Sequence, residues 1–441
     1  MFKTIRNAWS IPDLRRKILF TLLIVILYRV GSVIPVPFLD MDALAGAMKA
    51  VDEGGTMLSY INTLSGGAFS NATIFAMGIT PYINSSIIMQ LLTVAIPPLE
   101  RLAKEGEEGR KKIATITRYV TIALGLIQGT AYFFYLKRTK FEGAPITIFN
   151  EGFAMVYAAI VIILAFTAGT ALMMWLGEQI NNHGIGNGIS ILLFAGIVAR
   201  FPYTVTILSQ HWELAVSGSR QANFILVPLW VIIFVAIVWF ITFMQDSERR
   251  IPIQYAKRVV GRKMYGGQSS HLPIKVALGG VMPIIFASSI LSIPSTIKLF
   301  VTPKEGGFWA GFFNAFSTEG WLYAVCYFVL ILAFAYFYTA IQYNPIEMAN
   351  NLKSNNGTIP GIRPGQPTAD FIAKILSRIT LIGALFLAVI ALVPILFSMF
   401  SGLNGLSMGG TSIIIIVGVA LETAKQLESQ MMMRHYKGFL D

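Results

Sequence analysis

Long uninterrupted apolar runs constrain the fold of this chain more than any other feature. Residues 224–244 and 321–341 each contain no charged side chain over their whole length. A helix needs about 20 apolar residues to cross the hydrocarbon core of a bilayer. Strands of a membrane barrel instead alternate apolar and polar residues over about ten positions. The runs therefore predict membrane-spanning helices and argue against a β-barrel.

The composition excludes a soluble enzyme. Only 13% of the 441 residues are charged and 55% are hydrophobic, so there are too few charges to hydrate the surface in water. Cys326 is the single cysteine, which leaves no intrachain disulfide or cysteine-based metal cluster. The sequence contains no HExxH pair and no GxxxxGK[ST] run. We therefore expect no metal, no cofactor and no catalytic role, with any nucleotide chemistry supplied by a partner.

Ten apolar stretches are candidate membrane spans, and an even number places both termini on one side. They lie at residues 18–36, 72–94, 113–136, 153–176, 185–205, 224–244, 276–297, 321–341, 371–396 and 406–421. Most of the 34 lysine and arginine residues fall on the side of the termini, which the positive-inside rule assigns to the cytosol. The net charge of +12 is thus first a topology signal, and nucleic-acid binding through it would be confined to cytosolic loops, with ribosomal RNA as the candidate.

The two ends of the chain are predicted to be cytosolic segments. Phe2, Ile5 and Trp9 recur at helical spacing among basic residues, so residues 1–17 are expected to form an amphipathic helix on the membrane surface. Residues 422–441 form a tail on the same side.

The second and seventh spans are unusually polar for helices in lipid. Their polar side chains include Thr80, Asn84 and Gln90 in the second span, and Ser288 and Ser289 in the seventh. Such groups either line a polar space or pack helices together through small residues. Arg29 is the only clear charge inside a span, where it either snorkels or pairs with a carbonyl. The absence of a carboxylate near any span centre argues against an ion-coupled carrier.

An external segment, residues 56–70, is apolar but too short to cross a membrane. Its apolar side chains are Met57, Leu58, Tyr60, Ile61, Leu64 and Phe69, and pairs of glycines lie on both sides of the apolar stretch. The segment is either a surface cap or a re-entrant element that fills a funnel.

Two loops on the cytosolic side, 245–272 and 343–370, carry basic residues. In the first loop, apolar and polar side chains alternate from Arg250 to Arg258, Gly261 allows a turn, and residues 263–270 can return as a partner strand. This pattern predicts a hairpin. The basic residues of these loops that we single out are Arg249, Arg250, Lys257, Arg258, Arg262 and Lys263 in the first and Arg363 in the second. The alternative is that both loops are solvated connectors.

Five sequence runs resemble those of the SecY family of bacterial protein-conducting channels, over essentially the whole chain. They are GEQINNHGIGNGIS at 177–190, YAKRVVGRKMYGGQSSHLPIK at 255–275, GIRPGQP at 361–367, SGGAFSNATIFAMG at 65–78 and GGTS at 409–412. The resemblance implies an all-α membrane protein of ten helices, in two pseudo-symmetric halves at 18–205 and 206–421 around an hourglass pore. It also implies a bacterial plasma-membrane location and SecE and SecG subunits alongside.

The resemblance further implies roles for particular residues. The pore ring would consist of Ile79, Ile83, Ile189, Leu193, Ile285 and Ile415, with residues 56–70 as a plug helix and the second and seventh spans as a lateral gate. The basic loops would dock the SecA ATPase or the ribosome, and the channel would carry signal sequences and nascent chains or release them into lipid. A secondary transporter with broken helices is the alternative function. An intramembrane hydrolase lacks a nucleophile and base pair.

Overall fold

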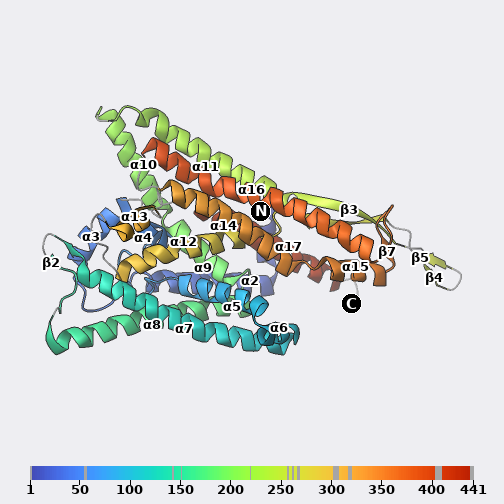
Figure 1. The fold of residues 1–441 in the computed structure, drawn as a ribbon, viewed down its shortest axis with the longest axis horizontal. Coiled ribbons are helices and arrows are strands. Elements are labelled where there is room, and N and C mark those ends of the chain that lie inside the picture. The colour runs from blue at the N-terminus through green and yellow to red at the C-terminus, as the bar shows by residue number, and fades with distance from the viewer. Residues whose placement is uncertain are drawn as a thin grey trace.

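The computed structural model is mostly helical, with strands gathered at one end of the molecule (Figure 1). It describes residues 2–53, 57–141, 144–149, 151–218, 220–255, 258–260, 263–265, 269–300, 307–315, 320–402 and 410–437.

The helices of the first half alternate between long spans and short surface segments. They are α1 (Phe2–Ser10), α2 (Pro12–Gly31), α3 (Met41–Glu53), α4 (Met57–Leu64), α5 (Thr80–Ala95), α6 (Pro97–Lys104), α7 (Glu107–Arg138), α8 (Gly152–His183) and α9 (Gly188–Ala199). The later helices are α10 (Phe201–Val216), α11 (Asn223–Asp246), α12 (Met282–Phe300), α13 (Phe308–Ala315), α14 (Trp321–Gln342), α15 (Pro345–Ser354), α16 (Gln366–Ser401) and α17 (Gly410–Lys437).

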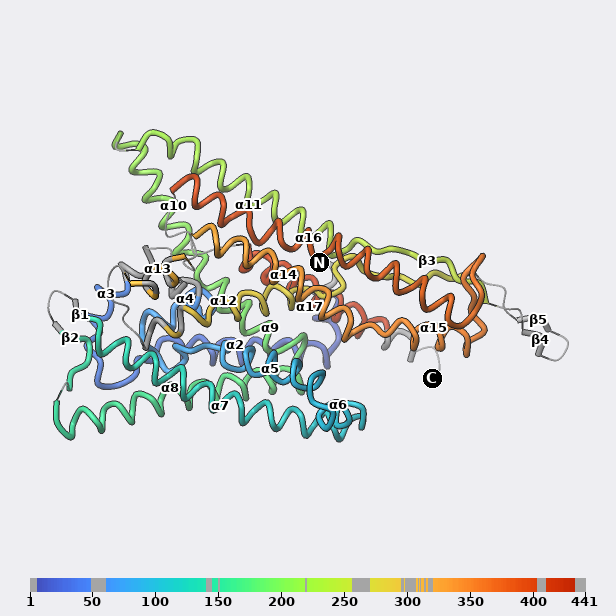
Figure 2. The backbone as a smooth tube through the Cα atoms, in the orientation of Figure 1, coloured from blue at the N-terminus to red at the C-terminus, as the bar shows by residue number. Residues whose placement is uncertain are grey.

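The long helices form two groups with a shared core between them. Figure 2 shows α2, α5, α7 and α8 on one side and α11, α14, α16 and α17 on the other, with α9 between the groups. The largest cluster of buried side chains draws on both groups, with Ile24 and Ile83 from the first and Ile331 and Ile415 from the second. The interior of the molecule is therefore the place where the two groups meet.

Among the described residues, seven helices are long and apolar enough to span a membrane, and the α5–α6 pair, bent by 101°, would be an eighth. Two of the ten predicted spans are not in this set. Helix α2 carries Arg15, Arg16, Lys17 and Arg29 within its 20 residues. Helix α12 runs from Met282 to Phe300, and its fully described apolar part is Met282–Pro294. The ten-span arrangement is consistent with these eight candidates, although α2 and the fully described part of α12 are not long and apolar enough by the same measure.

Three predicted span boundaries need correction. The second helix begins at Thr80 and not at residue 72, because Ala72 and Gly78 have φ of 40° and 56°, which a right-handed helix cannot continue through. The fifth span extends well beyond residue 205, since α10 follows directly after Arg200. The tenth, predicted to stop at 421, continues to Lys437.

The loop at 245–272 forms a longer hairpin than predicted. Strand β3 (Glu248–Tyr255) pairs antiparallel with β6 (Ser269–Lys275), whereas β4 (Arg258–Val260) and β5 (Lys263–Tyr265) pair with each other in a separate sheet. Both pairs follow one antiparallel register, with Gln254 opposite Ser269 and Arg258 opposite Tyr265. Residues 263–265 and 269–270 therefore return along the first strand as predicted, and the predicted turn at Gly261 lies outside the described residues. Strand β7 (Gly357–Thr358) from the second loop adds to the other edge of β3.

The amino-terminal helix is present but shorter than the predicted 1–17, because α1 ends at Ser10 and residues 12–17 belong to α2. Its Ala8 is buried with Leu14, Ile185 and Leu427, so α1 packs against α2, the start of α9 and the long α17. The two-stranded pair β1 (Lys140–Phe141) and β2 (Ala144–Pro145) lies with α3 and α13 at the end of the molecule opposite to strands β3 to β7 (Figure 1).

Candidate functional site

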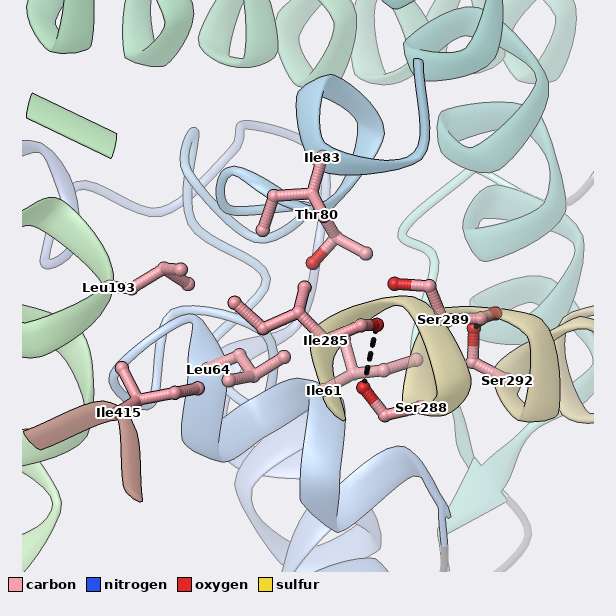
Figure 3. A pocket seen from close by; sticks show the side chains of 10 residues that line it. All are labelled: Ile61, Leu64, Thr80, Ile83, Leu193, Ile285, Ser288, Ser289, Ser292 and Ile415. Carbon is pink, nitrogen blue, oxygen red and sulfur yellow. Dashed lines mark hydrogen bonds between the residues drawn. The ribbon is translucent and has the colours of Figure 1, made fainter. Parts of the chain in front are cut away.

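A small cavity lies where the two groups of helices meet, at the centre of the molecule. Its volume is about 20 Å³, which is room for one or two water molecules. It is lined by Ile61, Leu64, Thr80, Ile83, Leu193, Ile285, Ser288, Ser289, Ser292 and Ile415 (Figure 3). None of these side chains is ionisable, so the space is an apolar constriction with a few hydroxyl groups and is closed to anything larger than water.

Four of the six residues assigned to the pore ring line this constriction. Ile83, Leu193, Ile285 and Ile415 come from α5, α9, α12 and α17, and their side chains converge in Figure 3. Ile79 does not line the cavity and is 3% exposed within the central core. Ile189 does not line it either and lies against Gly177 of α8. The structure thus brings four members of the predicted ring together and places two beside it.

The segment assigned as a plug contributes two side chains to the same cavity. Ile61 and Leu64 on α4 face the four aliphatic residues of the ring. Phe69 does not: its ring is buried against Tyr132 of α7, with ring centroids 4.3 Å apart. The side chains of Met57, Leu58 and Tyr60 lie outside the described residues.

The polar residues assigned to the lateral gate divide into two groups. Thr80, Ser288 and Ser289 line the constriction, where α5 contacts α12. Ser288 Oγ donates a hydrogen bond to the Ile285 carbonyl (2.9 Å), so its hydrogen is not available to a group in the cavity. Asn84 and Gln90 lie farther along α5 and do not line the cavity.

One further member of the cavity was missed by the sequence analysis. Ser292 lies one helical turn beyond Ser288 and faces the same space. The i, i+4 spacing of the two serines on the polar seventh span was a signal that could have identified it.

The basic residues assigned to docking lie at the strand-rich end. Arg249 and Arg250 are exposed on β3, and Arg250 Nε donates to Glu248 Oε1 at 2.7 Å. Arg258 and Lys263 fall on the paired β4 and β5. Lys257 and Arg262 lie outside the described residues.

The second loop is joined to the first by strand pairing. Arg363 is exposed, and its carbonyl accepts a hydrogen bond from Thr368 Oγ1 at 2.9 Å. Gln254 pairs with Thr358 and Tyr255 with Gly357, so the hairpin and the loop of Arg363 form one structure.

Two arginines lie inside the molecule next to the plug segment. Arg29 Nη1 donates to the Gly66 carbonyl at 3.3 Å. Of the two expectations for this residue, snorkelling or pairing with a carbonyl, the structure therefore shows the second. Arg200 lies between α9 and α10 and is 8% exposed. Its guanidinium also lies over the Tyr203 ring, 4.1 Å from the centroid.

A second and larger hollow is an apolar groove between α2, α9 and α17. Its volume is about 540 Å³. It is lined by Thr21, Leu22, Val25, Arg29, Ile191, Phe194, Ala195, Val198, Ala199, Val419, Ala420, Thr423, Ala424 and Leu427. Apart from Arg29, every residue of the groove is apolar or a threonine.

The fold and the constriction together define a multi-span helical membrane protein of the channel type. The SecY family model matches residues 73–424. The protein translocase subunit SecY of Bacillus subtilis is 46% identical over 447 residues and covers all of both chains. The chain therefore belongs to the SecY family.

Solved structures of channels have the same fold. One, described as "The plug domain of the SecY protein stablizes the closed state of the translocation channel and maintains a membrane seal", matches with a TM-score of 0.64 at 17% identity, over 95% of this chain and 92% of its own. The Sec61 channel in a canine ribosome–channel complex matches with a TM-score of 0.59 at 16% identity, over the same shares.

Proposed function

We propose that this chain is the central subunit of a protein-conducting channel that moves unfolded secretory polypeptides across the bacterial plasma membrane and releases transmembrane segments into lipid. The observation that carries the proposal is the closed apolar constriction between the two helix groups. Membership of the SecY family supports it.

The chemistry of the constriction suits a passage for polypeptides. A channel that must pass every side chain needs a narrow point without strong charged or hydrogen-bonding sites. A ring of aliphatic side chains also excludes water when the channel is idle and so blocks ions. Ile83, Leu193, Ile285 and Ile415 perform both tasks, with Ile61 and Leu64 of the plug filling the space between them.

The contact between α5 and α12 is our proposed lateral exit. Neither helix is an unbroken apolar span: α5 has Pro81 near its start and α12 has Pro294 inside it. A signal sequence or nascent helix gains a few tenths of a kcal/mol for each Leu, Ile or Phe that it places at the membrane centre. That gain favours parting two helices whose contact includes Thr80 and Ser289.

The partners follow from the surfaces. We assign the groove between α2, α9 and α17 to the transmembrane helix of a SecE subunit, because three helices line it and its surface is apolar along almost its whole length. SecG is placed alongside without a specific site. The basic loops at the strand-rich end dock the SecA ATPase or the ribosome, which puts this end and both termini in the cytosol.

The groove assignment has a direct test. Replacing Ala195 and Ala424 by Trp fills the groove and should reduce the amount of SecE that copurifies. A matched pair, Leu229→Trp and Ile232→Trp on the exposed face of α11, should not. Equal recovery of SecE with both pairs would place that subunit elsewhere.

No catalytic chemistry is assigned to the chain itself. A secondary transporter would need charged or coordinating groups at its midplane site. The ten residues that line the constriction include none. Energy for directional movement therefore comes from the motor or the ribosome.

The test of the proposed function is reconstitution. The chain, with SecE and SecG, is placed in lipid vesicles, and SecA, ATP and an unfolded secretory precursor are added. A precursor that becomes resistant to external protease only with ATP supports the proposal. A correctly assembled complex that never protects the precursor contradicts it.

A further inference from the structure

The end of the plug helix α4 is held by side chains from the body of the channel. Helix α4 ends at Leu64, and the chain turns sharply at Gly66 and Gly67, whose φ values are 68° and 90°. The turn satisfies part of the helix end internally, because Gly66 N donates to the Thr63 carbonyl and Gly67 N to the Asn62 carbonyl. The Ser65 carbonyl accepts a long hydrogen bond from Ala68 N at 3.4 Å, and both it and the Gly66 carbonyl accept further bonds from outside the turn.

Helix α2 supplies the donors of these further bonds. Tyr28 Oη donates to the Ser65 carbonyl at 3.1 Å, and Arg29 Nη1 donates to the Gly66 carbonyl at 3.3 Å. Two adjacent residues of one helix therefore bind two adjacent carbonyls at the carboxyl end of α4.

Helix α9 closes the other side of the turn. A Cβ atom at Gly66 would lie 3.0 Å from the Gly196 backbone and 2.8 Å from Arg29 Nη1, so only glycine fits there. A Cβ at Gly67 would lie 3.7 Å from Arg200, which places that buried arginine beside the second glycine. The glycine pair thus fits between two arginines.

The position of both charges at one end of α4 has an electrostatic consequence. The carboxyl end of a helix carries a partial negative charge, and a cation there is stabilising, more so where the site is shielded from water. Arg29 and Arg200 both lie at that end of α4, and both belong to the body of the channel. The attraction exists only while the plug is in place.

We propose that Arg29 and Arg200 form an electrostatic latch that holds the plug helix closed by binding its carboxyl end. The proposal rests on the proposed function, because it assumes that α4 is the plug. It assigns a conformational role to two arginines that neither line the constriction nor lie in the docking loops.

The latch predicts a graded leak of the idle channel. A cation at a helix carboxyl end changes an equilibrium roughly twofold to fivefold at an exposed site. Arg29→Gln and Arg200→Gln should therefore each raise the open probability of the idle complex in planar bilayers by about that factor. The double variant should raise it more than either single variant does, and the two effects need not multiply because both arginines act on the same end of α4. Arg29→Lys retains the charge and a donor and should stay close to the parent.

Arg220 offers a matched control. Its guanidinium also binds carbonyls at the carboxyl end of a helix, donating to Ser401 and Gly402 after α16 at 2.9 Å each. It has no contact with α4 among the described residues. Arg220→Gln should therefore cost stability without raising the idle conductance.

A second measurement follows the plug itself. In a Cys326→Ser background, Leu64→Cys should react with an external membrane-impermeant thiol reagent faster in the Arg29→Gln variant than in the parent. Should the double variant not fold, the two single variants decide the question by this rate and by conductance.

The latch is contradicted if the folded single and double variants conduct no more ions than the parent when idle, and if Leu64→Cys is labelled no faster in them. A variant lacking residues 57–65 must leak in the same experiment, which shows that loss of the plug can be detected. Precursor protection by the parent complex tests the proposed function separately, so the latch can fail while the channel assignment stands.

Discussion

At the scale of single residues, the constriction is built from side chains that offer a passing polypeptide nothing to bind. Four aliphatic residues from four different helices converge there, and the nearby Ser288 hydroxyl is occupied by the Ile285 carbonyl. A cavity of about 20 Å³ with this lining holds at most a water or two and does not form a continuous column. The seal therefore depends on the size of the side chains.

The seal can be tested by shortening those side chains. Replacing Ile83, Leu193, Ile285 and Ile415 by Ser should widen and wet the constriction, so that the idle complex passes ions in planar-bilayer recordings. The control makes the same replacement by Ser at Ile79 and Ile189, which are packed beside the cavity and do not line it. That pair should lower stability by a few kcal/mol without opening a path. A folded four-residue variant that stays tight, even with residues 57–65 removed, would separate these residues from the pore.

The predictability of individual residues depended on where their helices lie. The convergence of Ile83 and Ile285 was predicted from the resemblance to the SecY family, which places both residues in the pore ring. The end of the fifth span was predicted near residue 205, whereas the helical chain continues to Val216. Ile189 faces Gly177, a contact between helices that no local pattern encodes.

At the scale of elements, the loops 245–272 and 343–370 form one folded unit. Strand β3 alternates buried Ile251 and Ile253 with exposed neighbours, and its buried face packs on α16 through residues such as Ile372 and Leu376. The alternation predicted the strand, but its partner is set by tertiary contacts. The two-residue β7 was not predictable, because it pairs only through its backbone with a strand about a hundred residues earlier.

The packing under β3 has a measurable role. Ile251→Ala with Ile253→Ala should destabilise the sheet by about 2–5 kcal/mol for each side chain. Backbone amides of β3 and β6 should then exchange hydrogen faster, and binding of SecA or ribosomes should weaken although no basic residue has changed. Gln254→Ala, on the exposed face of the same strand, should change neither. Unchanged binding with a melted sheet would mean that docking does not need the folded unit.

The charge at the tip of the second loop is a separate test. Arg363→Glu should stop motor-driven or ribosome-driven transport and leave the protein folded in the membrane, because the exposed side chain contributes no more than about 0.5 kcal/mol to folding. Reversing a charge that binds an acidic or phosphate group can cost 2 kcal/mol or more. Lys353→Glu, an exposed charge on α15, is the control. A normal translocation rate with Arg363→Glu would make the loop a simple connector.

At the scale of the whole molecule, the ends of the long helices sort into two sides. The strands β3 to β7 lie at one end, and α3, α13 and the β1–β2 pair lie at the other (Figure 1). The apolar runs predicted most of the long helices, since a membrane solvent leaves few alternatives to a helix. They could not predict how far α16 and α17 extend past the hydrocarbon region, because helices continue in water wherever neighbours or caps support them.

The orientation can be measured by labelling. In the Cys326→Ser background, Lys353→Cys should react with a membrane-impermeant reagent only from the cytosolic side, and Glu151→Cys only from the outside. Both positions are exposed and lie at opposite ends of the molecule. Labelling of both from one side would contradict the five predicted spans that separate the two positions.

The connection from β6 to α12 joins the hairpin directly to a helix that lines the constriction. Strand β6 ends at Lys275, and a short segment, 276–281, leads directly into α12, which lines the constriction and contacts α5. Along this segment, Leu278 is buried on α16. A force applied to the hairpin therefore reaches α12 through a connection of only six residues, 276–281, and a partner bound to the hairpin would act first on the contact between α12 and α5.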